Sequence, residues 1–183
     1  MQRGANTLGK RFFMIRPVSD VILYAEDDDN DAFLIQLGFQ RAAVPNPIVV
    51  VQNGREAIDY LSGTGQYSGR AGEALPCLLL LDLKMPGVSG LEVLKWIRTT
   101  PSVSTLLVLM LTSSNQDADI HRAYLLGANG YLVKPSKIED IITMAKAVKD
   151  YWLVQNQQSA WRQSGVLNQE GNLAAPGGSA GGL

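Results

Sequence analysis

The sequence of 183 residues contains one cysteine, Cys77, and one histidine, His121. A single cysteine excludes an internal disulfide framework and any metal site built from several cysteines, and it is typical of a reducing compartment. No apolar run approaches the roughly 18 residues that a membrane-spanning helix needs. The 16 basic and 17 acidic side chains nearly balance, and no basic stripe is present that could neutralise a series of nucleic-acid phosphates. We therefore expect a cytoplasmic protein that binds neither a membrane nor nucleic acid.

Hydrophobic residues make up 46% of the chain and charged residues 18%, which is enough apolar surface for one folded domain of this length. The first residues, 1–18, carry basic side chains but only a short apolar run, whereas a secretory signal needs at least about seven apolar residues in a row. We interpret them as a flexible extension, with Met14 as a second candidate start. Residues 155–183 are rich in Gln, Ser, Asn and Gly and predict a flexible tail. The folded domain is then expected to span 19–154.

Five short apolar runs alternate with stretches of helical period between these two ends. Runs that are apolar throughout indicate strands buried on both faces, as in a parallel sheet covered by helices. The alternation predicts a doubly wound α/β fold with right-handed crossovers. The expected strands are 21–25, 48–51, 77–81, 106–111 and 130–133, and the expected helices are 31–43, 55–61, 91–99, 117–126 and 138–151. The Gly-rich stretch 62–75 is expected to be a surface insertion.

Reactive side chains follow four of the five runs. Glu26 and Asp27 follow the first, Asp82 the third, Thr112 the fourth and Lys134 the fifth. Because ligands bind at the carboxyl ends of strands in an open parallel sheet, these groups should meet at one rim. Carboxylates held close together repel one another, and either raised pKa values or a bound cation must relieve the repulsion. Oxygen ligands with open positions favour Mg²⁺.

These groups suit the transfer of a phosphoryl group onto a carboxylate. Asp82 stands alone at the end of the central run and is the predicted nucleophile, since an aspartate can attack a phosphoryl donor to form an acyl phosphate. Glu26 and Asp27 would hold the metal. The Lys134 ammonium and the Thr112 hydroxyl would contact phosphoryl oxygens.

Other polar side chains have simpler structural explanations. Asp28, Asp29 and Asp31 follow the first strand and are expected to cap the next helix near the positive end of its dipole. His121 lies in a stretch of mixed polarity and is interpreted as a surface residue, so a phosphodonor histidine would have to come from another protein. Cys77 begins an apolar run and is interpreted as a small buried side chain rather than a reactive thiol.

Several short motifs lie at or near the apolar runs, and their spacing along the chain matches that of a known protein family. They are Tyr24–Asp28 (YAEDD), Leu80–Pro86 (LLDLKMP), Gly90, Met110–Ser113 (MLTS), Gly127–Tyr131 (GANGY) and Lys134–Pro135. With these motifs the segment from 21 to 135 closely resembles the receiver domain of two-component response regulators. The resemblance implies a flavodoxin-like fold, with a five-stranded parallel sheet in the order 2-1-3-4-5 and five helices.

The resemblance also implies roles for the residues at the rim. Asp82 matches the phosphoacceptor of the family, and Glu26 and Asp27 match its acidic pair for Mg²⁺. The backbone carbonyl of Lys84, two residues past the phosphoacceptor, would complete the metal ligands that the protein supplies. Lys134 matches the family's invariant lysine.

Thr112 and Tyr131 match the switch pair of the family. In that mechanism the hydroxyl moves toward the new phosphoryl group and the aromatic ring follows inward, which changes the surface formed by the fourth helix, fifth strand and fifth helix. The family pattern also implies a cis peptide bond between Lys134 and Pro135, which would aim the lysine at the site. A cis bond before proline costs only about 0.5–1 kcal/mol relative to trans.

The insertion, together with the phrases Asp59–Leu61 and Gly65–Tyr67, resembles the stand-alone receivers that partner bacterial phytochromes. Every catalytic position of the pattern is occupied, so we expect a phosphorylatable single-domain response regulator, a switch more than an enzyme. Its donor would be a histidine kinase, phytochrome-like in this subgroup, and its output a protein target or a phosphotransfer protein. The sequence leaves open the kinase, the stimulus, the target and whether the chain forms a homodimer.

Two other functions compete with this hypothesis. One is a Mg²⁺-dependent phosphohydrolase with an aspartyl-phosphate intermediate. Haloacid-dehalogenase-like enzymes of that kind carry a second aspartate two residues after the nucleophile, where this chain has Lys84, and no cap domain is evident. The other is a nucleotide-binding flavodoxin-like module, but the first strand is followed by acids instead of a Gly-rich phosphate loop.

Overall fold

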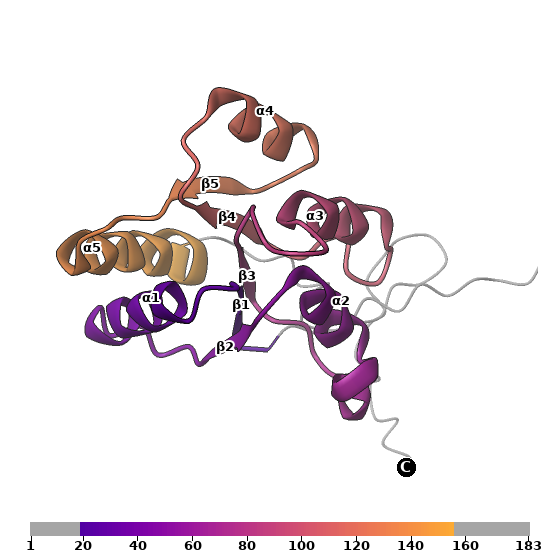
Figure 1. The fold of residues 1–183 in the computed structure, drawn as a ribbon. Coiled ribbons are helices and arrows are strands. Elements are labelled where there is room, and N and C mark those ends of the chain that lie inside the picture. The colour runs from indigo at the N-terminus through magenta and orange to yellow at the C-terminus, as the bar shows by residue number, and fades with distance from the viewer. Residues whose placement is uncertain (1–18, 156–183) are drawn as a thin grey trace, which may run out of the picture.

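A computed structural model describes residues 19–155, which form a five-stranded parallel sheet between two layers of helices (Figure 1). The strand order is β2-β1-β3-β4-β5, as predicted for a flavodoxin-like fold. The strands are β1 Ile22–Ala25, β2 Ile48–Val51, β3 Leu78–Leu81, β4 Val108–Thr112 and β5 Gly130–Val133. The predicted fold class is therefore confirmed.

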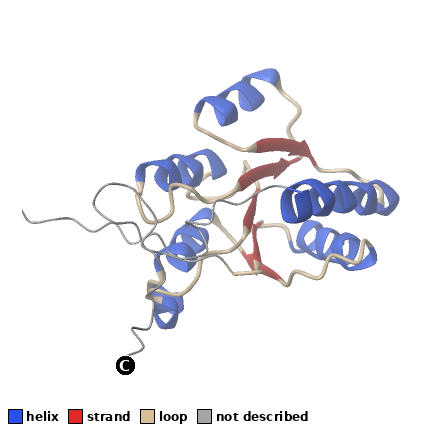
Figure 2. Ribbon diagram, turned by 180° about the vertical axis from the view of Figure 1, so that it is seen from behind, coloured by secondary structure: helices blue, strands red, loops and turns tan. Residues whose placement is uncertain are grey.

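Helices cover both faces of the sheet, as the two opposite views show (Figures 1 and 2). The first layer consists of α1 Asp29–Arg41 and α5 Ile138–Val148; the second consists of α2 Gly54–Ser62, α3 Gly90–Thr99 and α4 Asp117–Leu125. The predicted helix at 138–151 is shorter as an α-helix, because its last turns continue as a π-helix over Lys149–Gln155. Within residues 19–155, no helix combines the length and the apolar character needed to cross a membrane.

The central strands of the sheet are buried along their whole length. All four residues of β1 and all four of β3 are buried, whereas the edge strands β2 and β5 are partly exposed. Strands that are covered on both sides need apolar residues at every position. Ala25 pairs with Leu81 across β1 and β3, and the Asp82 amide donates to the Ala25 carbonyl at 3.0 Å. This register places the residues that follow β1 and β3 side by side.

The layer of α1 and α5 is closely packed. Gly38 on α1 lies against Ile141 on α5, where a Cβ at position 38 would collide with the Ile141 side chain. Ile35 and Phe39 on α1 are buried and join the same apolar core as Ile141. The small residue at position 38 therefore allows the two helices to approach one another.

The opposite layer holds α4 less firmly. Ala123 is the buried residue of this helix. Arg98 near the end of α3 reaches across to the loop after α4, where its Nε donates to the Gly127 carbonyl at 2.9 Å. The same guanidinium donates to the Ser104 and Leu106 carbonyls, each at 2.9 Å. One arginine thus ties α3 to the segments that lead into β4 and β5.

The predicted surface insertion contains a 3₁₀-helix over Gly65–Arg70. Its Tyr67 meets Tyr60 of α2 edge to face, with ring centroids 5.1 Å apart, and the Arg70 guanidinium lies 3.9 Å from the centre of the Tyr60 ring. These contacts hold the insertion against α2. The predicted extension at 1–18 lies outside the described residues, as does the predicted tail at 155–183 apart from Gln155, which ends the π-helix.

Candidate functional site

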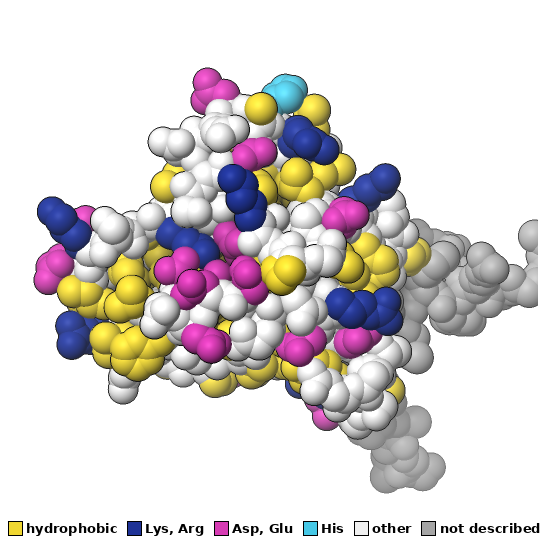
Figure 3. Space-filling view, in the orientation of Figure 1, with side chains coloured by type: hydrophobic (Ala, Val, Ile, Leu, Met, Phe, Trp, Pro, Cys, Tyr) yellow, Lys and Arg dark blue, Asp and Glu magenta, His cyan; other side chains and the backbone are white. Residues whose placement is uncertain are grey.

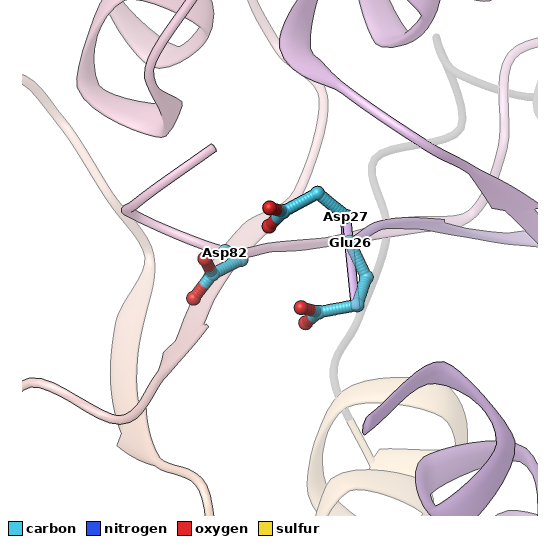
Figure 4. Close-up of side chains that lie close together, drawn as sticks. All are labelled: Glu26, Asp27 and Asp82. Carbon is cyan, nitrogen blue, oxygen red and sulfur yellow. The ribbon is translucent and has the colours of Figure 1, made fainter. Parts of the chain in front are cut away.

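The predicted acidic residues lie together at the carboxyl ends of β1 and β3. Acidic side chains gather at the centre of the face seen in Figure 3. Figure 4 shows the carboxylates of Glu26, Asp27 and Asp82 directed toward a shared space. One oxygen from each of the three lies within 4.8 Å of the others. The β1–β3 register therefore brings together two segments more than fifty residues apart in the sequence.

The three carboxylates differ in burial. Glu26 is 1% exposed and Asp82 4% exposed, whereas Asp27 is exposed to solvent. Buried carboxylates need charged partners or hydrogen-bond donors, because desolvation is costly for an ion. Solvent reaches the cluster from the side of Asp27, so a ligand from solution has access to the two buried groups there.

Lys134, directly after β5, supplies the positive charge of the site. Its Nζ lies 2.5 Å from Glu26 Oε2, 2.9 Å from Asp31 Oδ2 and 3.4 Å from Asp82 Oδ1. Burial lowers the pKa of Lys134, but the hydrogen bonds to Glu26 and Asp31 and the charges of Asp82 and Glu26 raise it, and the pKa lies above its ordinary value. The lysine is therefore a permanent cation between three carboxylates.

Both carboxylate oxygens of Glu26 are engaged. Oε2 accepts from the Tyr24 hydroxyl at 2.7 Å and from Lys134, and Oε1 accepts from the Asp28 amide at 3.3 Å. Burial raises the pKa of Glu26 above its ordinary value, although the hydrogen bonds from Lys134 and Tyr24 act in the opposite direction. Burial, together with the hydrogen bond to Glu26, also raises the pKa of Tyr24 far above its ordinary value, so Tyr24 remains a donor.

Asp82 is held by its neighbours in the chain and by Lys134. Its Oδ2 accepts from the Lys84 amide at 3.0 Å, and its Oδ1 faces Lys134. The main chain of Lys84 therefore lies beside the carboxylate, while the Lys84 side chain is exposed. Gly90 at the start of α3 packs directly on the Asp82 backbone, where a Cβ would collide with the Asp82 carbonyl oxygen.

Thr112 and Tyr131 lie on the adjacent strands β4 and β5. Thr112 is fully buried at the end of β4, and its hydroxyl oxygen accepts from the Ser114 amide at 3.4 Å. The Tyr131 hydroxyl donates to the Ser114 carbonyl at 3.0 Å. The Ser114 side chain donates to Asp119 of α4 at 2.6 Å. Ser114 thus connects both members of the predicted switch pair to α4, a connection that the sequence analysis did not identify.

The acidic residues after β1 have different roles from one another. Asp28 caps α1, with its side chain accepting from the Asn30 amide at 2.8 Å and the Asp31 amide at 3.0 Å, which confirms the predicted cap. Asp29 accepts from the Gln52 side chain at 3.1 Å. The expectation that Asp31 is a cap is wrong, because its carboxylate turns to the Lys134 ammonium, which is a stronger partner than a backbone amide.

The expected cis bond before Pro135 is also wrong. No cis peptide bond occurs within residues 19–155, so the Lys134–Pro135 bond is trans. Trans is the intrinsically preferred isomer even before proline. Lys134 reaches Glu26, Asp31 and Asp82 from this backbone, so the aim of its side chain does not require the cis form.

The donor set fits a hard divalent cation. It offers three carboxylates and no sulfur or imidazole, which is the chemistry that Mg²⁺ selects. Glu26, Asp27 and Asp82 would hold the ion. The position of the Lys84 carbonyl as a further ligand remains a prediction.

Comparison with known proteins agrees with this geometry. The family model described as "Response regulator receiver domain" matches residues 22–146. The chain is 36% identical over 137 residues to the Probable methanogenesis regulatory protein FilR2 of Methanothrix harundinacea, covering 75% of this chain and 86% of that protein. It is 31% identical over 133 residues to response regulator Rcp1 of Synechocystis, covering 73% of this chain and 88% of that protein.

Two crystal structures share the fold over most of the chain. The Mn²⁺-bound form of Rcp1 superimposes with a TM-score of 0.68 at 30% identity, over 76% of this chain and 99% of that one. The phosphorylated cyanobacterial phytochrome response regulator RcpA superimposes with a TM-score of 0.68 at 31% identity, over 78% of this chain and 97% of that one. A metal ion and a phosphorylated state are thus on record for proteins of this architecture.

Proposed function

Because the chain belongs to the response regulator receiver family of two-component signalling, we propose that it accepts a phosphoryl group on Asp82 in a Mg²⁺-dependent step. The observation that carries the proposal is the grouping of Glu26, Asp27 and Asp82 within 4.8 Å, with the Lys134 ammonium beside them. Receiver domains act as signalling switches. The product of the reaction is therefore a changed protein surface and not a released metabolite.

The reaction begins at the Asp82 carboxylate. One Asp82 oxygen attacks the phosphorus of a phosphohistidine on the kinase; the phosphorus–nitrogen bond breaks, and its electron pair returns to the imidazole, which then takes up a proton. The Lys84 amide and Lys134 orient the carboxylate for this attack. Because Asp82 is almost fully buried, few water molecules surround the nucleophile.

Charge on the transferred group is the main barrier to this reaction. Mg²⁺ held by Glu26, Asp27 and Asp82, with the Lys84 carbonyl, would supply Lewis-acid neutralisation of the phosphoryl oxygens. Lys134 stands 3.4 Å from Asp82 Oδ1 and is placed to pair with one such oxygen. The buried Thr112 hydroxyl at the neighbouring strand end is placed to donate to another.

The output is a shift between two shapes of the region around α4 and β5. When the Thr112 hydroxyl moves to the phosphoryl group, the Ser114 amide loses its acceptor, and the loop that carries the Ser114 carbonyl is released. Tyr131, which donates to that carbonyl, then turns inward. The Ser114–Asp119 hydrogen bond transmits the same change to α4.

The partners follow from this mechanism. A histidine kinase supplies the phosphoryl group, and the likeness to Rcp1 and RcpA supports a phytochrome-like kinase. The signal passes to a downstream protein or a phosphotransfer protein that reads the altered surface, or to a second copy of the chain as a homodimer. The chemistry that Thr112 and Lys134 assist is the receiver's own phosphorylation and slow dephosphorylation, and Thr112 is in addition a member of the switch pair.

The test is phosphorylation of the full chain by acetyl phosphate with MgCl₂, followed by intact-protein mass spectrometry. We expect a mass increase of one phosphoryl group in the wild type and none in Asp82→Asn, with unchanged circular dichroism. The matched control is Asp29→Asn, because Asp29 lies on the same rim but contacts Gln52 instead of the cluster. Equal labelling of Asp82→Asn would remove Asp82 from its role, and many turnovers of a chromogenic phosphomonoester would indicate a phosphohydrolase instead.

A further inference from the structure

Tyr24 is a tyrosine in the interior of β1 whose hydroxyl reaches the candidate site. Its side chain is 0% exposed, and its ring packs in the apolar core beneath α1 and α5. The hydroxyl donates to Glu26 Oε2 at 2.7 Å. A buried hydroxyl needs a hydrogen-bond partner. The partner of the Tyr24 hydroxyl is Glu26, which belongs to the acidic cluster.

The two carboxylate oxygens of Glu26 accept different numbers of hydrogen bonds. Each carboxylate oxygen has about two lone-pair positions. Oε2 uses both, one for the Tyr24 hydroxyl and one for the Lys134 ammonium. Oε1 has a single donor, the Asp28 amide, at the longer distance of 3.3 Å. Oε1 is therefore the oxygen that retains a free lone pair.

We propose that Tyr24 is a positioning residue of the metal site: its hydroxyl fixes the Glu26 carboxylate so that Oε1 faces a divalent cation while Oε2 stays with Lys134. This inference rests on the proposed function, because it assumes that the cluster of Glu26, Asp27 and Asp82 takes up Mg²⁺. It adds a residue to the machinery that lies below the rim and touches neither the ion nor the phosphoryl group.

The physical reason is preorganisation. A carboxylate that is held by a second partner loses less freedom when it binds a metal, and removal of such a partner typically weakens metal binding by about 10- to 100-fold. Without the hydroxyl, a lone pair of Oε2 becomes free and the carboxylate can turn about its last bond, held by Lys134 at Oε2 and by the Asp28 amide at Oε1. Both changes reduce the share of the Glu26 charge that is directed at a cation.

Tyr24→Phe removes only the hydroxyl and keeps the ring in the core. The matched control is Tyr60→Phe, since Tyr60 is likewise buried but lies on α2 against Arg70. Mg²⁺ affinity of the full chain is measured by isothermal titration calorimetry, and Mn²⁺ affinity by electron paramagnetic resonance. We expect the dissociation constants of Tyr24→Phe to rise roughly tenfold or more and those of Tyr60→Phe to stay within about twofold of the wild type.

A second measurement uses the wild type alone. The protein is labelled with tyrosine carrying ¹³C at the ring carbon that bears the hydroxyl, and the Tyr24 resonance is the one absent from Tyr24→Phe or, if that variant does not fold, from Tyr24→Leu. We expect this resonance to move on saturation with MgCl₂, because coordination at Oε1 changes the acceptor strength of Oε2. A packing role alone would leave it in place.

The outcomes separate this inference from the function on which it rests. Unchanged affinities in Tyr24→Phe, or a Tyr24 resonance that does not respond to Mg²⁺, would overturn the role of Tyr24 while wild-type metal binding and phosphorylation stand. A wild type that shows no saturable Mg²⁺ binding would overturn the metal step and the inference together.

Discussion

Asp31 on α1 and Lys134 after β5 are separated by 103 residues in the sequence, and the Lys134 Nζ lies 2.9 Å from Asp31 Oδ2. The same ammonium is 3.4 Å from Asp82 Oδ1. Asp31 therefore competes with Asp82 for the Lys134 ammonium, which also pairs with Glu26. Its side chain is 43% exposed, so water screens this competition in part.

The Asp31→Asn substitution should speed the phosphorylation of Asp82 by acetyl phosphate. Without the Asp31 charge, Lys134 moves closer to Asp82, where the phosphoryl charge arrives. Partly exposed ion pairs contribute about 0.2–1 kcal/mol, which corresponds to a rate increase of up to about fivefold. The rate is measured by quenched-flow sampling and mass spectrometry. Asp29→Asn removes the same charge from the same helical turn, and an equal increase in that variant would show a general charge effect instead.

The Gly90→Ala substitution should displace the backbone of Asp82 and so destabilise the protein. The new Cβ collides with the Asp82 carbonyl oxygen and with Leu83 Cα, which are backbone atoms and cannot rotate away. Insertion of a methyl group into a packed region typically costs about 1–3 kcal/mol of unfolding free energy. Urea denaturation measures this loss, and phosphorylation should slow in parallel.

Gly69→Ala is the control for Gly90→Ala, since no heavy atom lies within 4 Å of a Cβ at position 69. Its unfolding free energy should stay within about 0.5 kcal/mol of the wild type. Equal stability of the two variants would contradict the close packing of α3 on the Asp82 backbone.

The Arg98→Lys substitution should loosen the connection between α3 and the loops before β4 and β5. A lysine keeps the charge but cannot donate to the Gly127, Ser104 and Leu106 carbonyls at the same time. The loss of such hydrogen bonds costs about 1–3 kcal/mol, which urea denaturation measures. Hydrogen exchange should quicken most in α4. Arg55→Lys, on an exposed ion pair with Asp59, should change neither quantity appreciably, and identical effects in both variants would contradict the role of Arg98.

The Cys77 thiol should make stability fall in alkaline solution. Burial, with a smaller contribution from the charge of Asp20, raises the pKa of Cys77 from 9.0 to about 11. Between these two values the unfolded chain has lost the thiol proton and the folded chain retains it, so the unfolded state binds fewer protons and stability decreases as the pH rises. The decrease across this window is about 2–3 kcal/mol.

Urea denaturation of the wild type and of Cys77→Ala at a series of pH values isolates this effect, because the other titrating groups are common to both proteins. The wild type should lose stability more steeply above about pH 9. Parallel profiles would show that Cys77 ionises normally in the folded state.

The strands of the sheet could be predicted from the sequence because each one is marked by a short run of apolar residues. Uniform apolar runs defined β2 at 48–51 and β5 at 130–133 with the bounds that the structure has. The fourth strand was placed too early, at 106–111, because Leu106 and Leu107 are buried before the strand begins at Val108. An apolar pattern reports burial, and a buried residue need not be part of a strand.

The sequence predicts which residues form the site, but it does not predict the hydrogen bonds and ion pairs between them. The residues after β1 and β3 meet because the sheet register brings them together, so Glu26, Asp27 and Asp82 could be grouped from the order of elements. The Asp31–Lys134 pair and the Tyr24–Glu26 hydrogen bond depend on side-chain orientation across elements. Tyr24 gave no signal of its own, because a tyrosine within an apolar run looks like any other large core residue.

α4 is packed less firmly against the sheet than α1 and α5 are. Gly38 and Ile141 interlock α1 with α5, so the layer that carries Asp31 resists deformation. In the layer on the other side of the sheet, α4 has one buried residue, Ala123. A given force at the carboxyl ends of the strands therefore displaces α4 further than it displaces α1 or α5. The first layer acts as a fixed frame, so a structural change at the site is expressed mainly as a displacement of α4.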